Sequence, residues 1–141
     1  MVRIDVEYLG GLRCRSIHGP SGNELLTDAP VDNQGQGESF SPTDLVATAL
    51  ATCVLTTMGI VAQRHGWDLS GAHATVEKVM VSNPYRRIGR LELVVHMPSG
   101  LDQRARTTLE NTAHTCPVHR SLDSGVELPM RFEWTVGATS A

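Results

Sequence analysis

The sequence has little of three things that mark common classes of protein: aromatic residues, cysteine and an excess of basic charge. Aromatic residues make up 4% of the chain, so a core drawn from its 40% hydrophobic residues must be mainly aliphatic. A net charge of −3 argues against a nucleic-acid partner, which requires a basic patch. Three cysteines, at 14, 53 and 116, are too few and too widely spaced for the disulfide framework of a small secreted protein.

We expect neither an apolar leader nor a membrane anchor. Its first residues, MVRIDVEYLGG, contain no hydrophobic segment, so we expect a cytoplasmic protein. The segment 45–62 is uncharged and meets the minimum length of a transmembrane helix. Four threonines interrupt it, however, and a helix that is apolar on nearly all sides is also typical of a protein core. We therefore expect a buried helix and no membrane partner.

What the chain does contain is a regular succession of strand and helix signals. Alternating apolar and polar residues predict early strands joined by turns, and a polar, glycine-rich loop follows over 28–39. The expected strands cover 2–7, 12–17, 24–27, 72–81, 90–97 and 126–136, followed by a tail of small residues. A second helix is expected from 101 or 102 to 116. This order predicts an α+β fold and a single domain over 1–141.

The start of the long helix carries a specific signal. Ser41 is predicted to be the N-cap, Pro42 to occupy the first helical position and Asp44 to complete a capping box. The helix should run to 63–65 and end at Gly66. A helix with no polar face must be buried on all sides, whereas one six-stranded sheet would cover only one side of the helix. A second subunit would supply the missing cover, so we predict a homodimer.

Two of the cysteines are candidates for thiol chemistry. Cys53 lies in the middle of the apolar helix and Cys116 on the apolar face of the second helix, so the two thiols could meet in the core. Inert packing is the alternative, because free cysteine often behaves as a small buried hydrophobe. Cys116 precedes Pro117 and would occupy an N-cap-like position if 118–122 begins a new turn, which lowers a thiol pKa. Cys14 is expected only to pack.

A peroxide-reducing thiolate also needs a cation nearby and a second thiol that traps the sulfenic acid. Arg13 or Arg15 could supply the cation, although the sequence alone favours a solvated strand face for both arginines. A zinc site built from Cys53, His114, Cys116 and His119 is disfavoured, because the spacings of common zinc sites are missing. We expect no metal and no organic cofactor.

Two segments carry a resemblance to a known family. SPTDLVATALATC (41–53) and AHTCPVHRSL (113–122) resemble the OsmC/Ohr family, the osmotically induced and organic-hydroperoxide-resistance proteins. The resemblance implies an intertwined α+β homodimer whose strands flank a long central helix and a second helix. It implies that Cys53 reduces hydroperoxides through a sulfenic acid and that Cys116 resolves it as a Cys53–Cys116 disulfide. Arg13 matches the family's assisting arginine, although Leu12 separates it from the Gly10–Gly11 pair.

One position departs from the family pattern. Members that act on organic peroxides carry a glutamate directly after the helix-start proline, where Thr43 stands in this chain. Asp44 and Glu38 are the other acidic candidates, and Arg15 is the alternative arginine. We predict an antioxidant peroxidase that is reduced by an external dithiol. The alternatives are a non-enzymatic stress protein with an apolar ligand pocket at the dimer interface, and a thiol enzyme that transfers acyl groups or sulfur.

Overall fold

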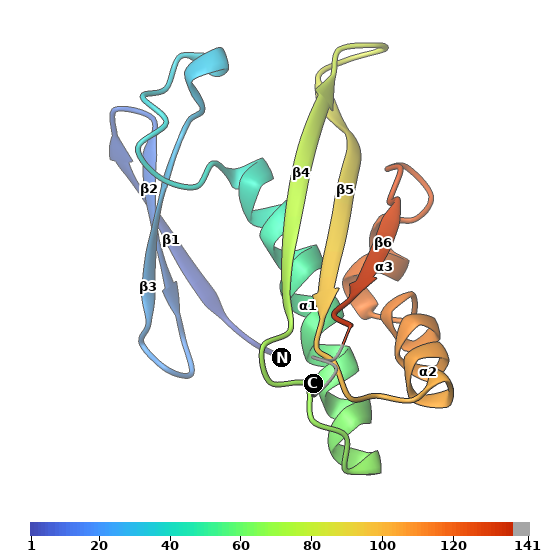
Figure 1. Ribbon diagram of the computed structural model, residues 1–141. Coiled ribbons are helices and arrows are strands. Elements are labelled where there is room, and N and C mark those ends of the chain that lie inside the picture. The colour runs from blue at the N-terminus through green and yellow to red at the C-terminus, as the bar shows by residue number, and fades with distance from the viewer. Residues whose placement is uncertain (137–141) are drawn as a thin grey trace. The chain divides into compact units, whose positions relative to one another are not determined.

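A computed structural model describes residues 1–136, and the tail of small residues lies outside this range. The chain divides into two compact units, one over 1–46 and one from Ala47 onward. Helix α1 (Pro42–His65) begins in the first unit and continues in the second. Strands and helices follow the expected order, which confirms the α+β class (Figure 1).

The first unit is an antiparallel sheet with the strand order β1-β2-β3. Its strands are β1 (Ile4–Gly10), β2 (Arg13–His18) and β3 (Glu24–Asp28), and the short 3-10 helix η1 (Val31–Asn33) follows. The turn between β1 and β2 has positive φ angles at Gly10 (83°), Gly11 (63°) and Leu12 (64°). Two of its three left-handed positions thus carry glycine, which adopts such angles without strain.

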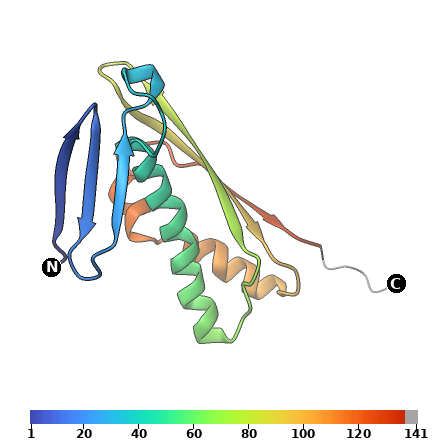
Figure 2. The same ribbon diagram turned by 90° about the vertical axis from the view of Figure 1, so that its left-hand side faces the viewer.

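The second unit builds a mixed sheet with the order β4-β5-β6. It contains β4 (His73–Val81), β5 (Arg87–Met97), α2 (Gln103–Ala113), α3 (Pro117–Leu122) and β6 (Met130–Trp134). Strand β5 pairs antiparallel with β4 and parallel with β6, because α2 and α3 carry the chain back before β6 begins. Figure 2 shows α1 and α2 on the same side of this sheet.

Two expectations about the strands need correction. The six strands form two three-stranded sheets rather than one sheet of six, because α1 separates β3 from β4 in the chain and neither pairs with the other. The last strand is also shorter than the predicted 126–136. Residues 126–129 form a connection in which the carbonyl of Glu127 accepts the amide of Leu91 at 2.9 Å.

The start of α1 has the predicted capping box. The Ser41 hydroxyl accepts the amide of Asp44 at 3.1 Å, and the Asp44 carboxylate accepts the amide of Ser41 at 2.9 Å. These two bonds satisfy groups that a helix end otherwise leaves without partners. Pro42 takes the first helical position, where a missing N–H costs nothing.

The core of the second unit is aliphatic, as the shortage of aromatic residues requires. Alternate residues of β5 face the helices, and the buried set comprises Ala47, Leu50, Val54, Met58 and Ala62 of α1, Leu91, Leu93, Val95 and Met97 of β5, and Ala105, Leu109 and Ala113 of α2. The buried residues of α1 recur every three or four positions, so one stripe of this helix is covered within a single chain.

Among residues 1–136, α1 alone is long and apolar enough to cross a membrane by length and composition. Its most apolar window has a mean hydropathy of 2.0, and 28% of that window is buried. The core helix of a soluble protein passes the same test, so this property is weak evidence for a membrane span.

Candidate functional site

Cys53 lies near the middle of α1, at the margin of its buried stripe. Leu50 and Val54 beside it are fully buried, whereas Cys53 itself is half-buried. Its sulfur lies 4.0 Å from the hydroxyl oxygen of Thr57, one helical turn further on. Cys53 is therefore partly accessible as a residue, and its sulfur lies next to the following turn of the helix.

Cys116 occupies the N-cap of α3, the position that the Cys-Pro sequence predicted. Its side chain is fully buried, and its sulfur accepts the amide of His119 at 3.2 Å. Pro117 supplies the first residue of this short helix. The break between α2 and α3 thus turns backbone N–H groups toward the Cys116 sulfur.

The thiols of Cys53 and Cys116 are close enough to interact electrostatically, and both cysteines are free. Helix α2 ends at Ala113, so Cys116 does not lie on the apolar face of the second helix, where it was expected. The pKa of Cys116 is raised, first by burial and then by the hydrogen bond and charge of Cys53; the amides of His119 and Val118 oppose this shift. The expectation of a lowered pKa at this N-cap is therefore wrong, because burial outweighs the amide contacts.

Arg13 lies in the first unit, at the start of β2 and opposite Asp28 of β3. Its guanidinium donates to the carboxylate of Glu38, and one of its nitrogens lies 3.7 Å from an Asp28 carboxylate oxygen. The hydrogen bond and charge of Glu38, followed by the charge of Asp28, raise the pKa of Arg13. Arg13 is thus a permanent cation with two acidic partners.

The other auxiliary candidates have separate partners. Arg15 donates to Glu7 at 2.6 Å and lies 4.0 Å from Glu24, and these acids raise its pKa. Asp44 belongs to the capping box of α1. The hydroxyl of Thr43 lies 3.2 Å from that of Ser41.

Comparison with known proteins places this arrangement in a family. The family model described as OsmC-like protein matches residues 35–130 of this chain. A protein from Psychrobacter arcticus, named for osmotic stress induction and detoxification, is 44% identical over 94% of this chain and 96% of its own. The two structures superpose with a TM-score of 0.88. The chain belongs to the OsmC-like family.

More distant structures share the OsmC-like fold. The organic hydroperoxide resistance protein OsmC of Legionella pneumophila is 21% identical, with a TM-score of 0.73, and the match covers 94% of this chain and 96% of that one. OhrB of Bacillus subtilis, also named for organic hydroperoxide resistance, is 18% identical, with a TM-score of 0.70 and coverage of 94% and 98%. A search of curated proteins gives no match.

Asp28 is a neighbour of Arg13 and Glu38 that the sequence did not single out. It is buried at 1% exposure and is shared by Arg13 and by the backbone of Glu38. In the sequence it stands at the start of a polar loop and looks like a turn residue. Only the pairing of β2 with β3 reveals that it lies opposite Arg13.

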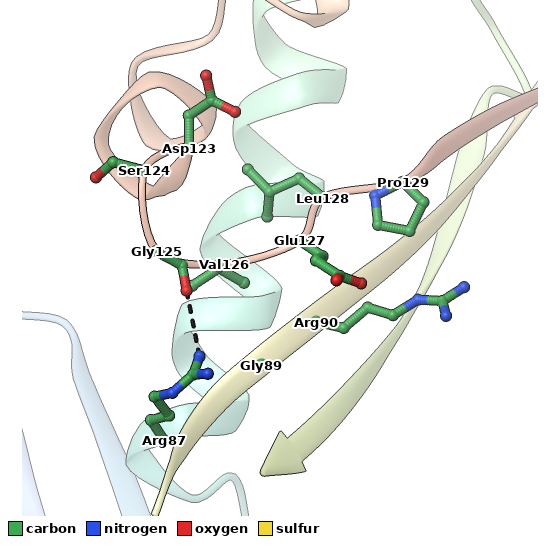
Figure 3. Close-up of a pocket in the computed structure, with 10 residues that line it drawn as sticks. All are labelled: Arg87, Gly89, Arg90, Asp123, Ser124, Gly125, Val126, Glu127, Leu128 and Pro129. Atoms are coloured by element: carbon green, nitrogen blue, oxygen red, sulfur yellow. Dashed lines mark hydrogen bonds between the residues drawn. The ribbon is translucent and has the colours of Figure 1, made fainter. Parts of the chain in front are cut away.

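Two surface pockets of the OsmC-like chain differ in how near they lie to Cys53 and Cys116. The first, of about 810 Å³, lies between β5 and the loop from α3 to β6, and neither Cys53 nor Cys116 lines it (Figure 3). Arg87 there donates to the carbonyl of Gly125 at 3.4 Å. The second, a groove of about 550 Å³ between α1 and α2, is lined in part by Thr57, the neighbour of Cys53. Only the second approaches the thiol pair.

The two histidines near Cys116, His114 and His119, pack against each other. The rings of His114 and His119 are edge-on, with centroids 5.6 Å apart. Within the part of the chain that the structure describes, no group of three or more metal-ligating side chains is arranged to hold a metal ion.

Proposed function

We propose that this OsmC-like protein is a thiol-dependent peroxidase that reduces organic hydroperoxides. The observation that carries the proposal is the placement of a half-buried cysteine on α1 and a fully buried cysteine at the N-cap of α3, where the first raises the pKa of the second. Proteins of the same fold that are named for organic hydroperoxide resistance support a role in peroxide detoxification. The family membership supports assigning that role to this site.

The first step oxidises Cys53. Its thiolate attacks one oxygen of the hydroperoxide, the O–O bond breaks, and the alcohol leaves after taking up a proton. Cys53 becomes a sulfenic acid. Cys116 keeps its proton at this stage, because burial and the charge of Cys53 both raise its pKa. The unequal surroundings of the two thiols thus favour Cys53 as the attacking group.

The second step resolves the sulfenic acid. A neutral sulfenic acid no longer carries the charge that raised the pKa of Cys116, whereas the amides of His119 and Val118 still favour the Cys116 thiolate. The Cys116 sulfur attacks the Cys53 sulfur, a disulfide forms and water leaves. An external dithiol then reduces the disulfide by exchange and is itself oxidised.

Arg13 is the proposed cation of this cycle, with Glu38 as the acid that accompanies it. A guanidinium stays charged and can donate hydrogen bonds to both a thiolate and a peroxide oxygen. The Arg13–Glu38 pair supports this role, because it supplies in this chain the arginine–acid pair that Thr43 cannot form.

We further propose that the protein acts in the cytoplasm as a homodimer.

Thiol counting after peroxide treatment tests the function. We expect reduced protein mixed with cumene hydroperoxide to lose the thiols of Cys53 and Cys116 and to keep that of Cys14, as measured by alkylation and mass spectrometry. Cys53→Ser should abolish turnover, whereas Cys116→Ser should stop at the sulfenic acid after one equivalent. Cys14→Ala is the matched control and should turn over normally. Retention of all three thiols would contradict the proposal.

The groove between α1 and α2 supports a second candidate, a non-enzymatic small-molecule-binding protein. The groove combines apolar Ile60 and Val61 with polar side chains, so it could hold an amphipathic ligand. The two candidates differ in Cys116→Ser. This substitution should stop turnover by a peroxidase, whereas it should leave the affinity of a ligand in the groove nearly unchanged.

A further inference from the structure

Asp28 is unusual in its burial. Among residues 1–136 it is the only charged residue classed as buried, with 1% of its surface exposed. Burial of a carboxylate is costly unless hydrogen bonds and an opposite charge compensate it. The contacts of Asp28 therefore identify the interactions that compensate for the burial of its carboxylate.

Three contacts tie Asp28 to the Arg13 site. Its Oδ2 atom accepts the amide of Glu38 at 3.0 Å and lies 3.7 Å from a guanidinium nitrogen of Arg13. Its own amide donates to the carbonyl of Phe40 at 3.0 Å. Its Oδ1 atom is buried and has no hydrogen-bond partner. One carboxylate thus joins Arg13, the backbone of Glu38 and the segment that leads into α1.

The two acids beside Arg13 are not equivalent. The Glu38 side chain is 57% exposed and belongs to the loop after η1, so solvent screens its attraction for the guanidinium. The Asp28 side chain is 1% exposed, and strand pairing places it opposite Arg13. Asp28 is therefore the fixed partner, and it also holds the backbone from which Glu38 extends.

We propose that Asp28 is a positioning residue that fixes Arg13 and the Glu38 loop in the arrangement used by the thiol chemistry. This role rests on the proposed function, in which Arg13 assists Cys53. Asp28 itself touches neither substrate nor sulfur in this scheme. It acts through the guanidinium and through the Glu38 amide.

The first test needs no activity. Hydrogen exchange at the Glu38 amide should quicken at least tenfold in Asp28→Ala, which removes the acceptor, and less in Asp28→Asn, which retains an amide oxygen. Glu24→Gln is the matched control, because Glu24 lies on the same strand and faces Arg15 instead. Unchanged exchange at Glu38 in Asp28→Ala would overturn the proposal.

The second test measures turnover with cumene hydroperoxide. Asp28→Asn should lower kcat/KM by about 10- to 100-fold, since small misplacements of a positioned group have effects of this size. Asp28→Asn combined with Glu38→Gln should fall to the level of Arg13→Ala and no further, because all three changes act through Arg13. Glu24→Gln should keep wild-type turnover.

The outcomes separate the two proposals. Inactive wild-type protein would overturn the peroxidase function and the positioning role with it. An active wild type with a folded and fully active Asp28→Asn variant would overturn only the positioning role. If Asp28→Asn does not fold, Asp28→Glu replaces it as the test variant, because it keeps the negative charge but moves the carboxylate by one methylene. Wild-type exchange and wild-type turnover in Asp28→Glu would likewise overturn the positioning role.

Discussion

At the scale of single residues, the thiol of Cys116 carries the most information about the site. Its pKa is raised chiefly by burial, and the hydrogen bond and charge of Cys53 add to this effect. The ionisations of neighbouring thiols are coupled, so a change at Cys53 must alter the titration of Cys116. The titration of Cys116 is therefore expected to respond to substitution of Cys53.

This coupling predicts the effect of Cys53→Ala. Removal of Cys53 should lower the pKa of Cys116, but burial should still keep it above the ordinary thiol value, because burial is the larger cause. The rate of Cys116 alkylation as a function of pH, read by mass spectrometry, measures the shift. Cys14→Ala provides the control, since Cys14 lies on β2. An unchanged or higher pKa of Cys116 in Cys53→Ala would be the contrary result.

The raised pKa of Cys116 also predicts a pH dependence of stability. The folded protein holds this proton more tightly than the unfolded chain, so its stabilising effect is complete below the ordinary thiol pKa. It is lost as the pH rises above that value toward the folded pKa. Urea unfolding under reducing conditions at pH 7 and pH 10 should show a smaller loss of stability in Cys116→Ala than in wild type. Parallel losses would show that Cys116 is not responsible.

At the scale of elements, the loop after β3 depends on a close backbone approach. A Cβ atom added at Gly35 would lie 1.7 Å from the carbonyl oxygen of Ala29, so any side chain there forces the loop to move. This loop carries Glu38, the partner of Arg13. Its position is thus set by glycine at Gly35 as well as by Asp28.

We therefore expect Gly35→Ala to destabilise the protein by roughly 1–3 kcal/mol, a range typical of single substitutions that introduce strain. It should also weaken the ion pair between Arg13 and Glu38. Thermal unfolding measures the first effect, and turnover measures the second. Gly125→Ala is the matched control, because a Cβ there meets no atom within 4 Å. Equal melting temperatures for the two variants would show that the loop adapts without cost.

These elements also show how far the sequence alone could lead. The capping box at Ser41 and the N-cap position of Cys116 follow from local patterns, and the structure confirms both. The pairing of Arg13 with Glu38 joins residues 25 apart, and its link to Asp28 depends on strand register. The rise in the pKa of Cys116 depends on burial and on Cys53, both of which are tertiary effects. Local patterns thus predict the helix caps, whereas the ion pairs of Arg13 and the pKa shift of Cys116 depend on the fold.

At the scale of the whole molecule, α1 is the element whose apolar surface a single chain leaves largely uncovered. It is apolar on nearly all sides, yet only 28% of its most apolar window is buried. Ile60 on this helix remains 47% exposed. Apolar surface of this kind favours association, because burying it removes it from water.

A charge at Ile60 tests the predicted homodimer. Light scattering at micromolar concentration should give wild-type protein twice the 15.3 kDa of one chain. Ile60→Glu should shift the mass toward one chain and lower the melting temperature, because an interface would bury the new carboxylate. Val136→Glu, at a position 85% exposed near the end of the described chain, should keep the wild-type mass. A wild-type mass of one chain, with Ile60→Glu melting like wild type, would mean that water covers this face of α1 and that each protomer must complete its own site.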